Sequence, residues 1–73
     1  MRLKFLNDGE TRIRLAAFMA DRRERTINDI LLRFKDLGFD VSEREAKKAL
    51  THLEQNGKLR VAYAESSRTW RME

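Results

Sequence analysis

The chain has 73 residues, the size of one small domain, with sixteen Lys and Arg residues against twelve Asp and Glu residues and a net charge of +4. It has no cysteine, which excludes disulfides, thiolate zinc sites and thiol nucleophiles. No apolar run approaches the ~20 residues needed to cross a membrane. We therefore expect a cytoplasmic protein without membrane contact, cofactor or metal. A pI near 10.0 is one mark of a nucleic-acid-binding protein.

The N-terminal third begins with a short segment of apolar and basic residues at positions 2–6, which predicts a short strand or an ordered arm within residues 1–9. A helix is predicted over residues 10–24, with Asp8 or Thr11 as its N-cap. One apolar face, expected to be buried, consists of Ile13, Ala16, Ala17 and Ala20. A second apolar face exceeds what a monomer requires, so it is the predicted contact of a homodimer unless residues 2–6 cover it. This second face consists of Leu15, Phe18 and Met19.

The next helix is predicted over residues 26–37, because Thr26 is a suitable N-cap and Gly38 a suitable stop after the last turn. Its predicted core side chains are Ile27, Ile30, Leu31 and Phe34. Residues 38–41 look too short to hold another element, so a third helix is expected directly across a tight turn.

The third helix, predicted over residues 42–56, has the clearest end signals, because Ser42 and Glu45 form a capping-box pattern and Gly57 follows the last turn. Its expected buried stripe consists of Ala46, Ala49, Leu50 and Leu53. At 100° per residue, the opposite face carries Arg44, Lys48, Thr51 and Gln55. After Gly57 the pattern alternates, which predicts a β-hairpin over residues 58–73, with Trp70 packed on the core beneath it.

This order of elements resembles the winged helix-turn-helix superfamily. The resemblance covers about residues 10–73, and its most specific part is residues 41–59, where a Ser cap, an apolar stripe and Gly57-x-Leu59 lead into the hairpin. It implies an α+β, mostly α, fold of three helices and a two-stranded β-wing, with residues 1–73 as one domain. It also implies that residues 42–56 are a recognition helix that enters the major groove of double-stranded DNA.

The DNA contacts that we predict are long donor side chains on the recognition helix and arginines on the wing. They are Arg44, Lys47, Lys48, Thr51, Gln55, Arg60, Arg68 and Arg71. Two simpler explanations stay open, namely a solvated polar helix face and arginines that protect an edge strand from aggregation. Residues 42–57 also contain as many acids as bases, and Glu43 would repel phosphate.

Two functions therefore remain. The leading hypothesis is a small transcriptional or mobile-element regulator that binds DNA, and the alternative is a winged-helix adaptor that binds a protein partner. Residues 44–51, followed by Ser66 and Ser67, are similar to the small D protein of the dissimilatory sulfite reductase system, a resemblance that implies an enzyme as the partner. No enzymatic activity is expected, because the chain has neither a G-x-S-x-G motif nor a glycine-rich phosphate loop, and His52 is its only histidine.

Overall fold

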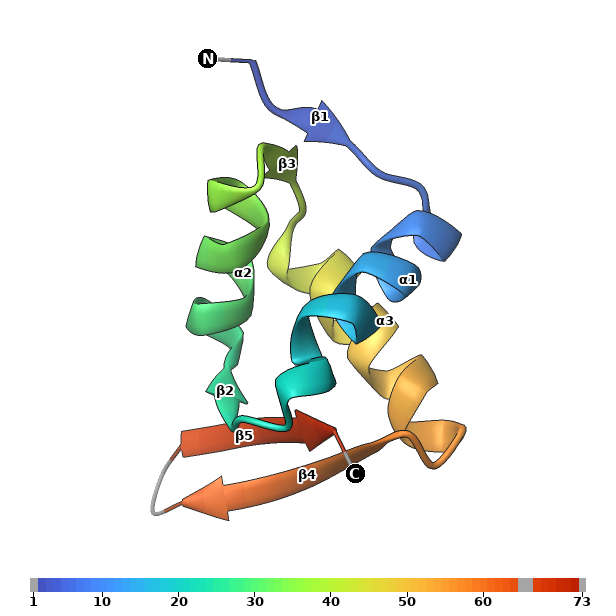
Figure 1. The fold of residues 1–73 in the computed structure, drawn as a ribbon, viewed down its shortest axis with the longest axis vertical. Helices are drawn as coiled ribbons and strands as arrows, with labels where there is room; N and C mark the ends of the chain where they lie inside the picture. Colours follow the sequence, from blue (N-terminus) through green and yellow to red (C-terminus); the bar gives the residue numbers. More distant parts are fainter. Residues whose placement is uncertain (1, 65–66, 73) are drawn as a thin grey trace.

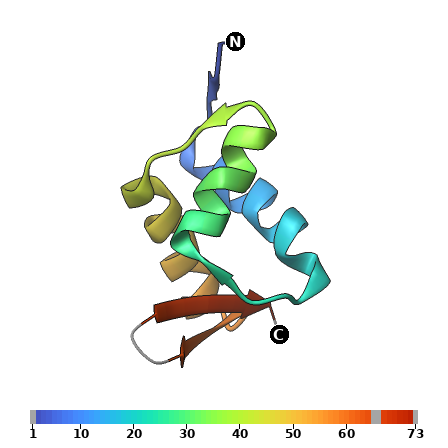
Figure 2. The ribbon, with the colours of Figure 1, turned by 90° about the vertical axis from the view of Figure 1, so that its left-hand side faces the viewer.

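Three helices lie on one side of a small antiparallel β-sheet in the computed structural model (Figure 1). The structure describes residues 2–64 and 67–72, and for residues 60–64 and 67 it describes the backbone. A view turned by 90° shows the same two layers, with the N-terminal segment at the end of the molecule far from the sheet (Figure 2). The α+β class is confirmed.

Helix α1 (Asp8–Phe18) begins two residues earlier than predicted. Asn7 is its N-cap, since the side chain accepts a hydrogen bond from Glu10 N at 2.8 Å and Asn7 N donates to the Glu10 carboxylate at 3.3 Å. The predicted caps at positions 8 and 11 are therefore wrong. The predicted end at residue 24 is also wrong, because a 3₁₀ turn, η1 (Met19–Asp21), follows and Arg22 adopts a left-handed conformation with φ 62°.

The buried face of α1 also differs from the predicted one. Leu15 and Met19 are completely buried and Phe18 is partly buried, whereas Ile13 is 72% exposed. The predicted homodimer face is thus wrong, because its side chains face the core and Phe18 meets the Phe34 ring edge-on, with 5.1 Å between ring centroids. Ala17 and Ala20, which were expected in the core, are exposed.

Helices α2 (Ile27–Asp36) and α3 (Glu43–Gln55) confirm the predicted start and stop signals. Thr26 and Ser42 each form a complete capping box with the third residue of the helix. Gly38 and Gly57 follow the two helices with φ of 88° and 72°, a region that disfavours side chains.

The core lies where the three helices meet the sheet. The side chains of α2 and α3 that were predicted to be buried lie in this core, and Ile27 and Leu31 are partly buried at its margin. Trp70 is 4% exposed and closes the core on the sheet side, as predicted. The buried apolar residues are Leu6, Leu15, Met19, Ile30, Phe34, Ala46, Ala49, Leu50, Leu53, Leu59 and Trp70.

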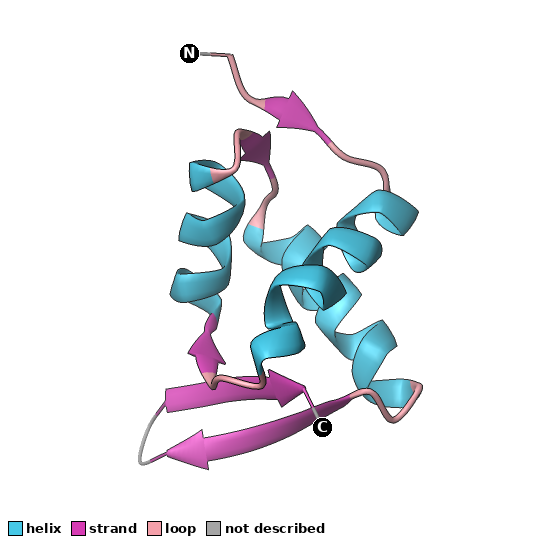
Figure 3. Ribbon diagram, in the orientation of Figure 1, coloured by secondary structure: helices cyan, strands magenta, loops and turns pink. Residues whose placement is uncertain are grey.

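The predicted hairpin is present as β4 (Leu59–Ala64) and β5 (Ser67–Met72) (Figure 3). A third strand, β2 (Arg25–Thr26), was not predicted; it pairs with β5 on the other side, so the sheet order is β2-β5-β4. The sequence pattern predicts the tip of this hairpin at residues 65–67, but Ser67 is already the first residue of β5, and residues 65–66 lie outside the described residues.

The N-terminal segment forms strand β1 (Lys4–Phe5), which pairs in parallel with β3 (Phe39–Asp40). Residues 38–41 thus do hold an element, contrary to expectation, because two residues suffice for a parallel pair with a segment distant in sequence. Lys4 N also donates to Gly38 O at 2.9 Å. In the part of the chain that is described, no helix has the length and apolar character to span a membrane.

Candidate nucleic-acid interface

Helix α3 presents its predicted contact face to solvent. Its alanine and leucine stripe is buried, and the predicted outward residues are exposed: Arg44, Lys47, Lys48, Thr51 and Gln55. The Ser42 hydroxyl accepts from Glu45 N at 3.2 Å, which satisfies a free amide of the first turn and fixes where the helix begins. The predicted orientation of α3 is confirmed.

Two of the three cations on α3 have acidic partners. Lys47 Nζ lies 3.4 Å from Glu43 Oε2, one turn earlier, and Lys48 Nζ lies 2.8 Å from Asp8 Oδ2 at the start of α1. Arg44 has no ion pair with any residue in the described ranges. The charges of α3 are therefore largely paired, and Arg44 is its cation most available to an anionic ligand.

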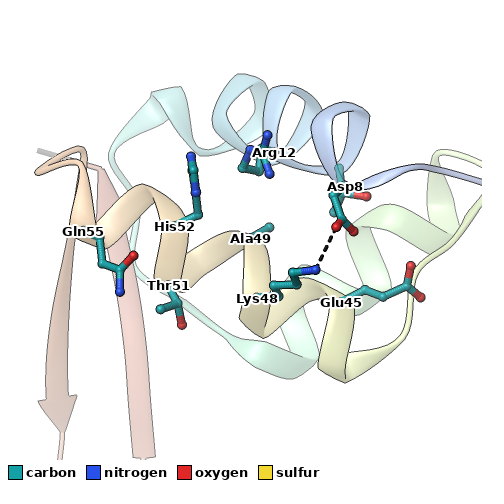
Figure 4. Close-up of a pocket in the computed structure, with 9 residues that line it drawn as sticks. Asp8, Arg12, Glu45, Lys48, Ala49, Thr51, His52 and Gln55 are labelled. Carbon is teal, nitrogen blue, oxygen red and sulfur yellow. Dashed lines mark hydrogen bonds and ion pairs between the residues drawn. The ribbon is translucent and has the colours of Figure 1, made fainter.

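A groove of about 320 Å³, here called the α1–α3 groove, lies between α1 and α3 (Figure 4). His52 points toward α1, whereas Thr51 and Gln55 point away from it. The pKa of the Asp8 carboxyl is lowered, chiefly by the hydrogen bond that Lys48 donates and secondly by the positive charge of Lys48. The groove is lined by Asp8, Thr11, Arg12, Glu45, Lys48, Ala49, Thr51, His52 and Gln55.

A second groove, here called the β5 groove, lies between the start of α2, α3 and β5, with a volume of about 300 Å³. It is lined by Thr26, Ile27, Asn28, Lys47, Arg68 and Trp70. Arg68 is positioned by Trp70, since its guanidinium carbon lies 5.1 Å from the centre of that buried ring. Two cations from different elements thus border one groove, and none of the described residues that line it has a carboxylate.

The comparisons with known proteins identify the fold. No family model matches the chain, and no curated protein matches it. A solved structure of HOP2, from work on the DNA recognition and protein interaction domains of that protein, superposes with a TM-score of 0.73 over 86% of this chain and 98% of that one, at 17% sequence identity. This chain has a winged-helix fold. Strands β4 and β5 are its wing, and α3 is the helix that directly precedes the wing in the chain.

The wing does not gather its arginines on one surface. Side chains alternate along a strand, so Arg68 shares the face of Trp70, whereas Arg71 is exposed on the opposite face of β5. The register places Arg60 directly across from Arg71, and the Arg60 side chain lies outside the described part. Contacts of these arginines with DNA stay predictions.

Sequence reasoning missed two contributors to this surface. Asn28 reaches the β5 groove because β2 pairs with β5 and brings the start of α2 beside the wing. Asp8 reaches α3 across 40 positions of sequence. Neither contact leaves a periodic signal along the chain, because each depends on how separate elements pack. Among the described residues, no three His, Asp or Glu side chains are grouped to hold a metal ion.

Proposed function

We propose that this winged-helix protein is a non-enzymatic binder of double-stranded DNA, with α3 in the major groove and the wing on the phosphate backbone. The observation that carries the proposal is that Lys47 of α3 and Arg68 of the wing border the same groove. A major groove about 12 Å wide admits a helix, and the two cations of the β5 groove would contact phosphates beside that helix.

The predicted contacts divide into two chemical roles. Arg44, Thr51 and Gln55 are exposed donors on α3 and are the residues that we assign to base edges. Lys47 and Arg68 are assigned to phosphates, and Arg71 to the backbone beyond the other face of the wing. The resemblance in fold to HOP2, whose DNA recognition and protein interaction domains have been described, supports DNA binding as the function.

Within this proposal, the biological role is that of a small regulator of transcription or of a mobile element. A single domain of this size makes few base contacts, so a specific site would be occupied by more than one copy or within a larger assembly. The buried apolar face of α1 cannot join two copies, because Leu15 and Met19 are inside the fold.

The test is fluorescence anisotropy with a labelled duplex between 50 and 200 mM salt. Affinity should fall steeply with salt, and each variant that removes a phosphate contact should reduce the slope of log K against log salt by about 0.9. We expect Arg44→Ala and Arg68→Ala to weaken binding, whereas Arg33→Ala, which removes an exposed arginine of α2, should change it little. Equal affinity in all three variants would overturn the proposed face.

A protein-binding adaptor is the second candidate, favoured by the paired charges of α3 and by an apolar groove of about 360 Å³ beside α2 and β3. Leu32, which lines this groove, is 58% exposed. The adaptor predicts a complex that survives nuclease treatment and is lost in Leu32→Asp, together with no binding to duplex at 50 mM salt. The DNA proposal predicts the opposite result in the duplex assay.

A further inference from the structure

One ion pair ties the recognition helix to α1. Lys48 Nζ and Asp8 Oδ2 are 2.8 Å apart, and both side chains are more than half exposed. Figure 4 shows the Lys48 side chain extending along the groove toward Asp8, while Thr51, one turn further on, points away from α1. Among the ion pairs of the described residues, Arg25–Asp21 and Lys47–Glu43 are local in sequence, so the Lys48–Asp8 pair is the one that joins two helices.

Asp8 is held in its charged form by its surroundings. It lies in the first turn of α1, where the partial positive charge of the helix end favours an anion. Lys48 adds a hydrogen bond and a full positive charge, and both lower the pKa of the Asp8 carboxyl. At neutral pH this carboxylate therefore neutralises Lys48 and repels phosphate from the start of α1.

The two sides of α3 consequently differ in charge. The α1–α3 groove is lined by the carboxylates of Asp8 and Glu45 as well as by Arg12 and Lys48. The β5 groove is lined by Lys47 and Arg68, and none of the described residues in its lining has a carboxylate, although Glu43 pairs with Lys47 beside it. A polyanion in contact with α3 would meet charges that cancel on one side and, with Glu43 counted against Lys47, a net positive charge from the described residues on the other.

We propose that Asp8 is a positioning residue for DNA docking: it holds Lys48 against α1, keeps phosphate away from the α1–α3 groove and directs the DNA backbone to the β5 groove. This inference rests on the proposed function, because it concerns how the same surface meets a duplex. It revises the predicted role of Lys48 as a DNA contact, because Lys48 would contact phosphate only when the Asp8 carboxylate is neutralised.

The test is Asp8→Asn in the anisotropy assay with the full chain. Freed from its partner, Lys48 gains a phosphate contact, so affinity at 50 mM salt should rise several-fold. One added contact steepens the salt slope by about 0.9, so the gain should shrink about threefold to fourfold between 50 and 200 mM. Lys48→Ala should have a small effect in the wild type and should abolish the gain in the Asp8→Asn background.

The matched control is Asp36→Asn, which changes the net charge equally at an exposed position near the end of α2. Circular dichroism establishes that each variant is folded. An equal gain in Asp8→Asn and Asp36→Asn, or a gain that persists without Lys48, overturns the positioning role. If Arg68→Ala weakens binding while Asp8→Asn leaves it unchanged, this inference alone is overturned. If the wild type does not bind the duplex at 50 mM salt, the proposed function is overturned as well.

Discussion

Replacing Leu15 by alanine tests which side of α1 faces the core. Leu15 is 0% exposed, and the change deletes three buried carbon groups. At about 0.8 kcal/mol for each, transfer alone costs about 2.4 kcal/mol, and the cavity left behind raises the loss to about 3–4 kcal/mol. Ile13 is 72% exposed, so Ile13→Ala should change the free energy of unfolding by less than about 0.5 kcal/mol.

Urea denaturation followed by circular dichroism measures both losses. A domain of this length has a total stability of about 4–11 kcal/mol, so Leu15→Ala would remove a large part of it. If that variant does not fold, Leu15→Val should still cost about 1 kcal/mol and supplies a graded measurement. A loss from Ile13→Ala equal to that from the Leu15 variants would refute the burial of α1 described above.

Two further predictions concern the ends of helices. Ser42→Ala should lower the free energy of unfolding by about 1 kcal/mol in urea, because it removes the acceptor of the Glu45 amide; Ser42→Asp should restore most of that loss. Hydrogen bonds from the Arg25 side chain and from the Arg23 amide lower the pKa of Asp21 below 3.8. This pair therefore stabilises the fold above about pH 4 and is lost on acidification, so the difference in Tm between wild type and Asp21→Asn should narrow as the pH falls below 4.

The elements predicted correctly have signals contained within a few residues. Thr26 and Ser42 cap their helices with side chains three positions away, and Gly38 and Gly57 end them through backbone conformations that glycine adopts freely. The outward direction of Arg44 followed from the same local periodicity. Such features need no knowledge of the rest of the chain.

Helix α1 was predicted less well because its sequence has two apolar faces. The stripe that includes Ile13 and the stripe that includes Leu15 both have helical spacing, and only packing against α3 decides between them. Thr11 adds to the ambiguity, since it is buried with its hydroxyl donating to Asn7 O at 2.8 Å. The end of the helix was missed because an arginine, Arg22, takes the left-handed conformation that usually signals glycine.

The candidate site was predicted in part. The exposed donors of α3 follow from its periodicity, but the ion-pair partner of Lys48 comes from α1, and Arg68 shares its groove with residues of α2 and α3. Strands of two residues, such as β2, have no alternation to detect and exist because a distant strand offers them hydrogen bonds. The charge balance of each groove therefore required the tertiary structure.

Strand β2 also has a mechanical consequence. Thr26 pairs with Thr69 of β5 and also caps α2, so one residue connects the helix to the wing. A hairpin attached only at its base could swing, whereas this one is hydrogen-bonded to β2 as well. The pairing with β2 thus fixes the position of β5 relative to the start of α2, two of the elements that line the β5 groove. A partner that binds there would therefore lose less entropy in ordering the backbone of the wing than it would with an unattached hairpin.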